Sequence, residues 1–394
     1  MPYLYDSLLS ICSSNDGFYY KDVVLDSTTY RIFNYRLCSY TTFHSLPYAL
    51  NCRGTMFNIN DPNNLQLVSL PPEKFFNYEE GIGFDQHKQG QLGDQMDKLD
   101  GSLISTFIHF DDKNQAIVRL KSKTSLTSSQ ACEAMELFKG KFKSEVENLV
   151  NLHYTINMEY TSPSNRIVLH YPQAELTVLS IRSHLTGETL FARHLQSFLV
   201  EHNFQSILEH IVPFKSIPRH LSHKEFCQNI YGETQGEGYV VEIIRTDQSS
   251  YLVKIKTHKY LQLHHCKDKV NSPRHLFESI INEQSDDLRS LFQDNPGALE
   301  SISKMEEQVR SQFNHMVKSI EEFYETNKSL SRKDYAILIN NTPSIKKYMG
   351  LLMNLYLDKI NDYKQYAITH AKDLFGINDN CQASSRSNAE EEED

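Results

Sequence analysis

Residues 98–102 read Lys-Leu-Asp-Gly-Ser, which places a lysine directly before a tight turn. A lysine amine held beside bound phosphates can attack a nucleoside triphosphate and form a covalent lysyl-nucleotide. That reaction also needs carboxylates for a metal or a sugar, and further cations for the phosphates. The chain offers these residue types downstream, in the order Glu159, Glu237, Lys254 and Lys256. The set predicts nucleotidyl transfer through a covalent intermediate on Lys98.

Each of these residues alone has a simpler interpretation. Lys98 could be a solvated lysine beside an ordinary turn. Lys254 and Lys256 are two residues apart, so on a strand both point to one face, where they suit phosphates or simply water. Glu159 and Glu237 could hold a metal or a ribose hydroxyl, or be exposed surface. Only the order of the whole set favours a site.

Upstream residues extend the candidate site. Arg53 precedes Gly54 at the expected start of a strand, and the fork of an arginine suits phosphate. Residues 73–77, Glu-Lys-Phe-Phe-Asn, join a cation to aromatic rings that could stack on a base or pack in a core. Asp286 and Asp287 follow Ser285, where they could cap a helix, bind magnesium or lie on the surface.

The elements that must position these residues are mostly strands from about 17 to 262. Alternating residues around polar turns predict hairpins, with strands over 102–110 and 116–121, 156–161 and 167–171, and 238–245 and 251–257. A helix at the start, over 1–12, and one interrupting helix, over about 128–150 with Ser128 or Ser129 as its cap, are also expected.

After about residue 270 the apolar spacing becomes helical, as at 302, 305, 309, 313, 316, 320 and 323. Ser331, Pro343 and Gly376 suit helix ends. We therefore expect an α+β protein. Antiparallel sheets with flanking helices form a nucleotidyltransferase domain over 1–262, an all-helical domain covers 263–376, and a disordered acidic tail covers 377–394.

Composition limits the partners. The formal charge is −10 and the last five residues are all acidic, so any nucleic acid must bind in a local basic groove. Seven scattered cysteines suit a reducing compartment. No long apolar run predicts a membrane span, and the first residues do not resemble a signal peptide, so a cytoplasmic protein without a membrane partner is expected.

Taken together, the motifs resemble the RNA ligase 1 family, typified by the tRNA-repair RNA ligase of T-even bacteriophages. The resemblance spans about residues 1–292. The residues that carry it are 30–33 with Tyr35, 52–54 with Met56 and Phe57, 73–77, 98–103, 121–123, Glu159 with 163–168, 237–240, 254–256 with Tyr260, and 285–288.

The resemblance implies an ATP-dependent ligase that joins a 5′-phosphate to a 3′-hydroxyl in RNA. Lys98 would carry AMP, which then passes to the RNA 5′-phosphate before the 3′-hydroxyl displaces it. Residues of the ATP site would be Tyr35, Arg53, Lys74, Phe76, Lys121, Glu159, Glu237, Lys254 and Lys256. Tyr260 would serve a later step on RNA, and Asp286 and Asp287 would hold Mg²⁺, for which Mn²⁺ can substitute.

The family further implies tRNA with a broken anticodon loop as substrate, recognised by the helical domain, and an end-healing kinase-phosphatase as partner. A phage origin would place the protein in the host cytoplasm. Two alternatives stay open. A DNA ligase or capping-type transferase would append an OB fold after Lys256, and a non-catalytic RNA-binding relative would take no label from ATP.

Overall fold

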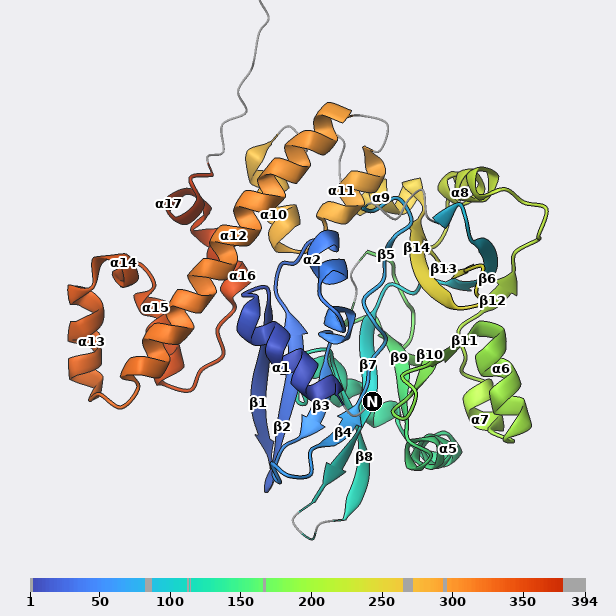
Figure 1. Cartoon of the computed structure of the whole chain (residues 1–394), viewed down its shortest axis with the longest axis horizontal. Coiled ribbons are helices and arrows are strands. Elements are labelled where there is room, and N and C mark those ends of the chain that lie inside the picture. The colour runs from blue at the N-terminus through green and yellow to red at the C-terminus, as the bar shows by residue number, and fades with distance from the viewer. Residues whose placement is uncertain are drawn as a thin grey trace, which may run out of the picture. The chain divides into compact units, whose positions relative to one another are not determined.

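The computed structural model describes residues 3–81, 87–111, 113, 115–165, 168–264, 272–292 and 296–377. It divides the chain into two compact units, Met1–His264 and His265–Asp394. The first unit holds the described strands, and the described part of the second is helical (Figure 1). The predicted α+β fold class is confirmed.

The N-terminal sheet is an antiparallel meander in the order β1-β2-β3-β4. Its strands are β1 (Phe18–Leu25), β2 (Thr28–Tyr35), β3 (Thr55–Asn58) and β4 (Gln66–Ser69). Helix α1 (Leu4–Ser14), α2 (Tyr40–Ser45) and the short η1 (Ala49–Asn51) accompany it. Apolar residues of α1, β2 and α2 share one buried cluster with Cys52, so this packing fixes the backbone next to Arg53.

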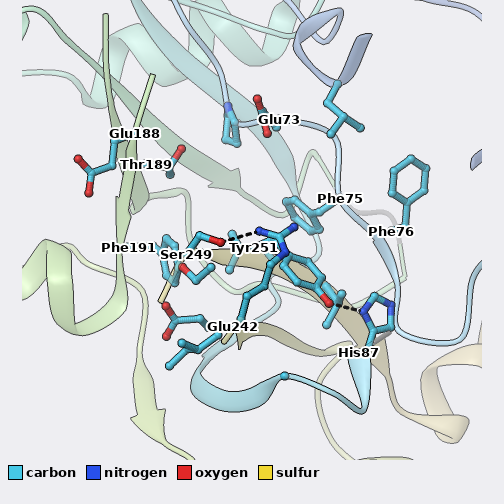
Figure 2. A pocket seen from close by; sticks show the side chains of 18 of the residues that line it. Glu73, Phe75, Phe76, His87, Glu188, Thr189, Phe191, Glu242, Ser249 and Tyr251 are labelled. Atoms are coloured by element: carbon cyan, nitrogen blue, oxygen red, sulfur yellow. Dashed lines mark hydrogen bonds between the residues drawn. The ribbon is translucent and has the colours of Figure 1, made fainter. Parts of the chain in front are cut away.

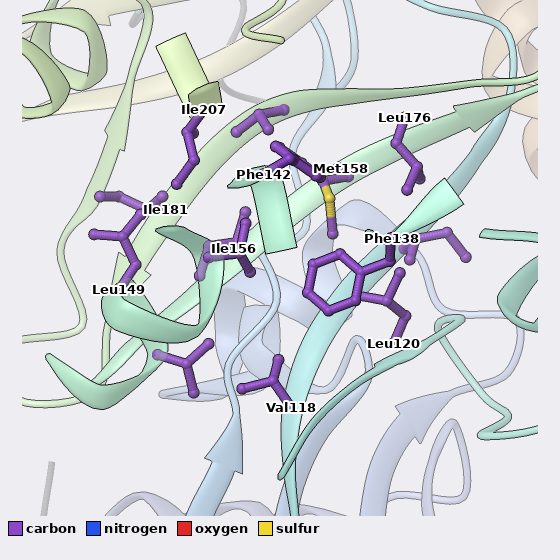
Figure 3. Packing of buried hydrophobic residues seen from close by; sticks show 14 of the residues in the cluster. Val118, Leu120, Phe138, Phe142, Leu149, Ile156, Met158, Leu176, Ile181 and Ile207 are labelled. Atoms are coloured by element: carbon purple, nitrogen blue, oxygen red, sulfur yellow. The ribbon is translucent and has the colours of Figure 1, made fainter. Parts of the chain in front are cut away.

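The central sheet has the order β11-β10-β9-β7-β8. Its strands are β7 (Ser102–Phe110), β8 (Ala116–Lys121), β9 (Tyr154–Thr161), β10 (Glu175–Ser183) and β11 (Thr189–Phe191). Helices α4 (Ser129–Leu137), α5 (Gly140–Asn151), α6 (Ala192–Glu201) and α7 (Gln205–Leu208) cover one face. Figure 3 shows the apolar core between them, in which Phe138, Phe142 and Leu149 meet Ile156 and Met158.

The third sheet has the order β12-β6-β13-β14-β5. Its strands are β5 (Phe76–Asn77), β6 (Gln91–Asp97), β12 (Phe214–Ser216), β13 (Gly238–Ile244) and β14 (Ser250–Lys256). Neighbours run antiparallel except β5, which lies parallel to β14. Helix α8 (His223–Gly232) packs on one face, where Phe226 meets Val253 and Ile255.

The opposite face of the third sheet meets the central sheet. Met96, Val240 and Leu252 share a small apolar cluster with Leu179 and Phe191. Since Lys254 and Lys256 follow Leu252 at two-residue spacing, both lysines belong to this inner face. The chemistry therefore lies where the two sheets face each other.

The second unit begins after α9 (His258–His264), the last helix of the first. Its helices are α10 (Pro273–Ile281), α11 (Ser285–Leu291), α12 (Pro296–Asn327), α13 (Arg332–Asn341), α14 (Pro343–Lys346), α15 (Met349–Tyr356), α16 (Tyr363–Thr369) and α17 (Ala371–Phe375). Buried residues of α12 at helical spacing, including Ile302, Val309, Phe313 and Ile320, supply much of its core.

Predicted helix ends are confirmed. Ser128 and Ser331 cap α4 and α13 by accepting from backbone N–H groups, and Pro343 opens α14. Gly376 follows α17 with φ of +71°, the left-handed conformation that suits glycine. The tail predicted from 377 onward lies outside the described residues, apart from residue 377 itself.

Three predictions of local structure were wrong. The helix expected over 128–150 is two helices, because the chain turns at Phe138 and Lys139 before Gly140, whose φ is +59°. Helices α2, α6, α7 and α8 also interrupt the strands, whereas one helix was expected there. The partner of β9 after its turn is β10, whose strand begins at Glu175, and no strand covers 168–171.

Candidate active site

Lys98 begins the tight turn between β6 and β7. Its backbone N–H donates to Gly238 O at 2.9 Å, which ties the turn to the start of β13. Its side chain is about one fifth exposed, and Nζ lies 2.8 Å from Glu237 Oε1. The candidate nucleophile is therefore held in place by backbone and side-chain contacts, yet remains reachable.

Glu237 joins the two ends of the predicted set. Its side chain is 3% exposed, and the same Oε1 atom also lies 3.0 Å from Lys256 Nζ. The backbone supports this position, because Glu237 O accepts from Thr257 N and Gly238 pairs with Lys256 across β13 and β14. One buried carboxylate thus holds two lysines, whose positive charges it balances only in part.

Gly238 is required for that approach. A Cβ atom there would lie 2.0 Å from Ile255 O, and its φ is +139°. A side chain would push β13 away from β14 and separate Glu237 from Lys256. The Glu-Gly pair of the sequence is thus a structural necessity as well as a motif.

Glu159 lies in β9, opposite Leu103 of β7. Its Oε1 accepts from Gly101 N at 3.1 Å, so it contacts the lysine turn itself. Burial raises its pKa to about 7, and the nearby positive charge of Lys98 opposes that rise. Glu237 raises this pKa further and Arg53 lowers it, which places all three charges around the Glu159 carboxyl.

Asp100 is a residue whose role the sequence did not reveal. It is 2% exposed, and its Oδ1 accepts from Tyr260 Oη at 2.8 Å. Its Oδ2 accepts from the backbone N–H groups of Val168 and Leu169. Asp100 therefore ties the lysine turn to α9 and to the loop after β9. These hydrogen bonds also explain why residues 168–171 form no strand, because the N–H groups of Val168 and Leu169 donate to Asp100 and not to a neighbouring strand.

Tyr260 lies beside the lysines as well. Lys256 Nζ is 5.0 Å from the centre of its ring, within the range of a cation–π contact. The ring is buried, with 2% of its surface exposed. Tyr260 thus links Lys256 to Asp100.

A second group of cations surrounds Tyr35. Lys74 Nζ donates to Tyr35 Oη at 3.3 Å, and Lys123 Nζ lies 4.8 Å from the ring centre. Lys121 is fully buried, with Nζ donating to Ser122 O, and burial lowers its pKa to about 7. A Cβ on Gly54 would lie 3.2 Å from Lys121 Nζ, so these lysines adjoin the Arg53-Gly54 pair.

Arg53 connects the second cation group to Glu159 through the charge interaction described above. Its guanidinium lies 6.0 Å from the centre of the Phe75 ring. Its buried Nη1 has no hydrogen-bond acceptor among the described residues. A buried guanidinium donor without an acceptor is costly unless a ligand supplies one, and a phosphate oxygen suits it.

A cavity of about 1070 Å³ adjoins Arg53 and the second cation group at the third sheet, with lining residues from both faces of β14. It is lined by Lys74, Phe75 and Phe76, by β11, and by the far end of the β13–β14 hairpin (Figure 2). Lys98, Glu159, Glu237 and Lys256 do not line it. Lys74 and Phe76, two residues predicted for the ATP site, do line the cavity, so it adjoins that site and shares part of its wall.

Comparison with family models decides the family. Residues 51–260, more than half of the chain, match the model "RNA ligase", and residues 267–378 match "T4 RNA ligase 1, C-terminal domain". The chain belongs to the RNA ligase family. The resemblance inferred from the motifs is confirmed.

One relative of this RNA ligase family member comes from Autographa californica nuclear polyhedrosis virus and is named as a bifunctional polynucleotide kinase/RNA ligase. It is 26% identical over 263 residues, which is 62% of this chain and 35% of the relative. The chain thus spans about a third of that relative.

Solved structures of RNA ligases are more distant. An archaeal ATP-dependent RNA ligase is 11% identical, with a TM-score of 0.47 over 82% of this chain and 80% of the other. A Naegleria gruberi RNA ligase is 15% identical, with a TM-score of 0.40 over 51% and 60% of the two chains. Other Naegleria gruberi structures contain ATP and Mn.

The structure brings some predicted residues of this RNA ligase family member together. Lys98, Glu237 and Lys256 meet directly, Glu159 and Arg53 join them through charge, and Tyr260 joins through Lys256. Lys254 shares their strand face. Tyr35, Lys74 and Lys121 belong to the second cation group. The centre of the Phe76 ring lies 5.4 Å from Lys74 Nζ, but the ring packs in a buried cluster with Tyr40 and Phe43.

Asp286 and Asp287 lie in the second unit, in the first turn of α11. Asp287 is 3% exposed. Because they belong to the other unit, their relation to Lys98 is not described, and their role in metal binding stays a prediction.

Among the described residues of the first unit, one pair of carboxylates suits a divalent metal. No group of three or more histidine, cysteine, aspartate or glutamate side chains could hold a metal in the described part of the chain. Glu159 and Glu237 are nevertheless close enough to influence each other's charge. Mg²⁺ commonly uses one or two carboxylates together with substrate phosphates and water, and this pair suits that arrangement.

Two further predictions concern a membrane-spanning helix and an OB fold after Lys256. Within the described residues no helix is long and apolar enough to cross a membrane. No strand follows Lys256 in the described part of the chain, so the OB fold expected of a DNA ligase or capping-type transferase is not seen there.

Proposed function

We propose that the protein is an ATP-dependent ligase that joins a 5′-phosphate to a 3′-hydroxyl in RNA. Family membership supports this assignment. The observation that carries it is the convergence of Lys98 and Lys256 on the buried Glu237, beside the Glu159 carboxyl. A reactive lysine, two carboxylates and further cations are what adenylation of a lysine requires.

In the first step Lys98 Nζ attacks the α-phosphate of ATP. A nitrogen–phosphorus bond forms, the bond to the pyrophosphate oxygen breaks, and pyrophosphate leaves. The amine must give up a proton before or during the attack. The Lys98 side chain is about one fifth exposed, so water can take this proton while Glu159 holds the metal.

The remaining cations neutralise the phosphates. Lys254 and Lys256 share the inner face of β14, and Arg53 offers a buried donor that lacks an acceptor among the described residues. We assign Tyr35, Lys74, Phe76 and Lys121 to the outer part of the ATP site. A bound Mg²⁺ or Mn²⁺ would offset phosphate charge, with Glu159 and Glu237 as ligands in the first unit and Asp286 and Asp287 as candidates in the second.

In the later steps AMP passes from Lys98 to the RNA 5′-phosphate, and the 3′-hydroxyl then displaces AMP. In the last step Lys98 is no longer covalently bound to AMP. We assign Tyr260 to one of these later steps on RNA, since it donates a hydrogen bond to Asp100 of the lysine turn.

The finer substrate follows from family resemblance. We propose tRNA with a broken anticodon loop as the natural RNA, recognised by the helical unit over 263–376. A kinase-phosphatase that heals the ends would act before sealing, as the kinase part in the name of the viral relative suggests. Such a reaction would take place in the cytoplasm, or in the host cytoplasm for a viral protein.

The experiment that tests the assignment mixes the protein with α-labelled ATP and Mg²⁺. We expect a covalent AMP adduct in the wild type and none in Lys98→Ala. The matched control is Lys113→Ala, which removes an exposed lysine from the β7–β8 turn and should keep the adduct. No adduct on the wild type would favour a non-catalytic RNA-binding protein.

A second assay separates loss of the nucleophile from loss of the fold. Lys98→Ala should still seal RNA whose 5′ end is already adenylated, since that step needs no lysyl-AMP. Sealing of DNA nicks in preference to RNA, or labelling by GTP, would instead indicate the DNA ligase or capping-type alternative.

A further inference from the structure

The cavity beside the active site is built from aromatic and cationic side chains. Phe75, Phe191 and Tyr251 line it, and Figure 2 shows them with Glu242 around one space. Arg245 also lines it, with its guanidinium 4.2 Å from the centre of the Tyr251 ring. Aromatic faces together with basic side chains are the usual means of holding single-stranded nucleic acid without reading its sequence.

The position of the cavity relates it to the reacting phosphate. Leu252 lines the cavity and belongs to the same strand face as Lys254 and Lys256. Val253 lines the cavity as well, so the cavity begins beside Lys254 and, at a rise of about 3.3 Å per residue, about 10 Å from Lys256 along β14. A nucleotide next to the reacting phosphate can therefore extend into the cavity.

The cavity also has a fixed polar group. Glu242 is 3% exposed, and its Oε2 accepts from Asp94 N at 3.2 Å. A Cβ on Gly93 would lie 2.2 Å from that oxygen, so glycine leaves the room that the carboxylate occupies. A carboxylate accepts hydrogen bonds only, and a ribose 2′-hydroxyl or a base amino group can donate one.

Size favours a polymer segment over a single small ligand. The volume of about 1070 Å³ is at the upper end of the range for pockets that hold one drug-sized molecule. The lining includes acids as well as cations, since Glu73 and Glu188 also face it. A triphosphate would meet those acids unfavourably, whereas a strand carries one charge per nucleotide and can direct its bases inward.

We propose that this cavity binds the single-stranded RNA next to the ends being joined, with bases against Phe75 and Tyr251 and a backbone phosphate at Arg245. The inference rests on the proposed function, because it names where that substrate lies. Phe75, Tyr251 and Arg245 are not among the residues assigned to ATP, whereas Lys74 and Phe76 line the same cavity and form its border with the ATP site.

The test uses the full-length, adenylated protein and a fluorescent single-stranded RNA with hydroxyls at both ends, which cannot itself be adenylated. We expect Arg245→Ala to weaken RNA binding about tenfold and to reduce its salt dependence, and Tyr251→Ala to weaken it about tenfold through lost stacking. Arg245 is exposed, so its variant should fold. Arg219→Ala, another exposed arginine outside the cavity lining, is the matched control and should bind normally.

Labelling with ATP on the same proteins keeps the two ideas apart. We expect Arg245→Ala to form lysyl-AMP at the wild-type rate. Slower labelling with unchanged RNA binding would show that the cavity serves ATP and would overturn the inference. Unchanged RNA binding and unchanged labelling would overturn it too, and the proposed function would stand. Absent labelling in the wild type would reject the function instead.

Cross-linking supplies an independent outcome. RNA with a photoreactive base next to the joined end should attach to the peptide that contains Phe75 or Tyr251, and less so in the presence of unlabelled RNA. Attachment only to peptides of the helical unit would contradict the proposal.

Discussion

Glu237 is the residue on which both lysines of the site depend. Glu237→Gln keeps the shape but removes the charge that Lys98 and Lys256 share. We expect the free energy of unfolding to fall by about 1–3 kcal/mol, because two largely buried cations lose their carboxylate. Lysyl-AMP formation should fall at least a hundredfold. Urea unfolding and labelling with ATP measure the two effects.

Glu188→Gln is the control for that change, since Glu188 is exposed. It should change the free energy of unfolding by no more than about 0.5 kcal/mol and should leave the rate of lysyl-AMP formation unchanged. A normal labelling rate in Glu237→Gln would mean that Lys98 is positioned by its turn alone.

We expect Lys121, which is assigned to the ATP site, to reduce the free energy of unfolding because its charge is buried. Burial lowers its pKa from 10.5 to about 7, and its one described partner is a carbonyl oxygen. The unfolded chain therefore binds more protons between pH 7 and 10.5, and the energetic cost of Lys121 grows as pH falls through that window. We expect Lys121→Met to raise the free energy of unfolding by about 2 kcal/mol at pH 7.

The gain from Lys121→Met should shrink as the pH is raised from 7 through 10.5 and should vanish above that, where the lysine is neutral in both states. Urea unfolding of both proteins across this range checks the sign. Lysyl-AMP formation should be lost at every pH. A gain that is independent of pH would show that packing, and not charge, causes it.

At the scale of elements, the lysine turn depends on one glycine. A Cβ on Gly101 would lie 2.4 Å from Tyr160 O and 3.1 Å from Glu159 Cγ. We expect Gly101→Ala to separate β7 from β9 and to move the turn away from Glu159, because the nearest atom is a backbone oxygen that cannot rotate out of the way as a side chain could. The free energy of unfolding should fall by about 2 kcal/mol or more, and adduct formation should fall with it.

Gly232→Ala is the matched control. Gly232 is the last residue of α8, and nothing lies within 4 Å of the Cβ it would gain. The change should be neutral or stabilise by up to about 1 kcal/mol, because alanine favours helix. Thermal unfolding of both variants decides the matter, and equal effects would contradict the steric argument.

Element types were predictable where local rules dominate. The β7–β8 and β13–β14 hairpins follow from alternation around polar turns, and Ser128 and Ser331 from capping chemistry. The strand expected over 167–171 failed because Asp100, far away in sequence, takes the N–H groups of Val168 and Leu169. Such long-range hydrogen bonds leave no periodic pattern in the sequence.

The residues of the candidate site also divide into those that local sequence predicts and those that depend on distant segments. The two-residue spacing of Lys254 and Lys256 predicted a shared face, and the structure has it. Asp100, Lys123 and the acceptor-free Nη1 of Arg53 emerge only when distant segments meet. The lowered pKa of Lys121 likewise needs knowledge of burial, which no single motif contains.

At the scale of the whole molecule, the two units divide the predicted chemistry. Lys98, Glu159, Glu237, Lys254, Lys256 and Tyr260 all belong to Met1–His264. That unit has its own apolar cores on each sheet, so it meets the usual requirement for independent folding. Asp286 and Asp287 belong to the other unit.

We therefore expect the fragment 1–264 to fold and to form lysyl-AMP with ATP, because every assigned lysine and carboxylate except the aspartate pair is present. Sealing of RNA should fall at least tenfold, since the helical unit over 263–376 is assigned to substrate binding. Labelling and sealing of adenylated RNA measure the two activities separately. The full-length chain with Asp286→Asn and Asp287→Asn is the matched control. If both the fragment and that variant lose labelling while remaining folded, the aspartates act in adenylation itself. If only the fragment loses it, the helical unit stabilises the first unit and has no chemical part in the first step.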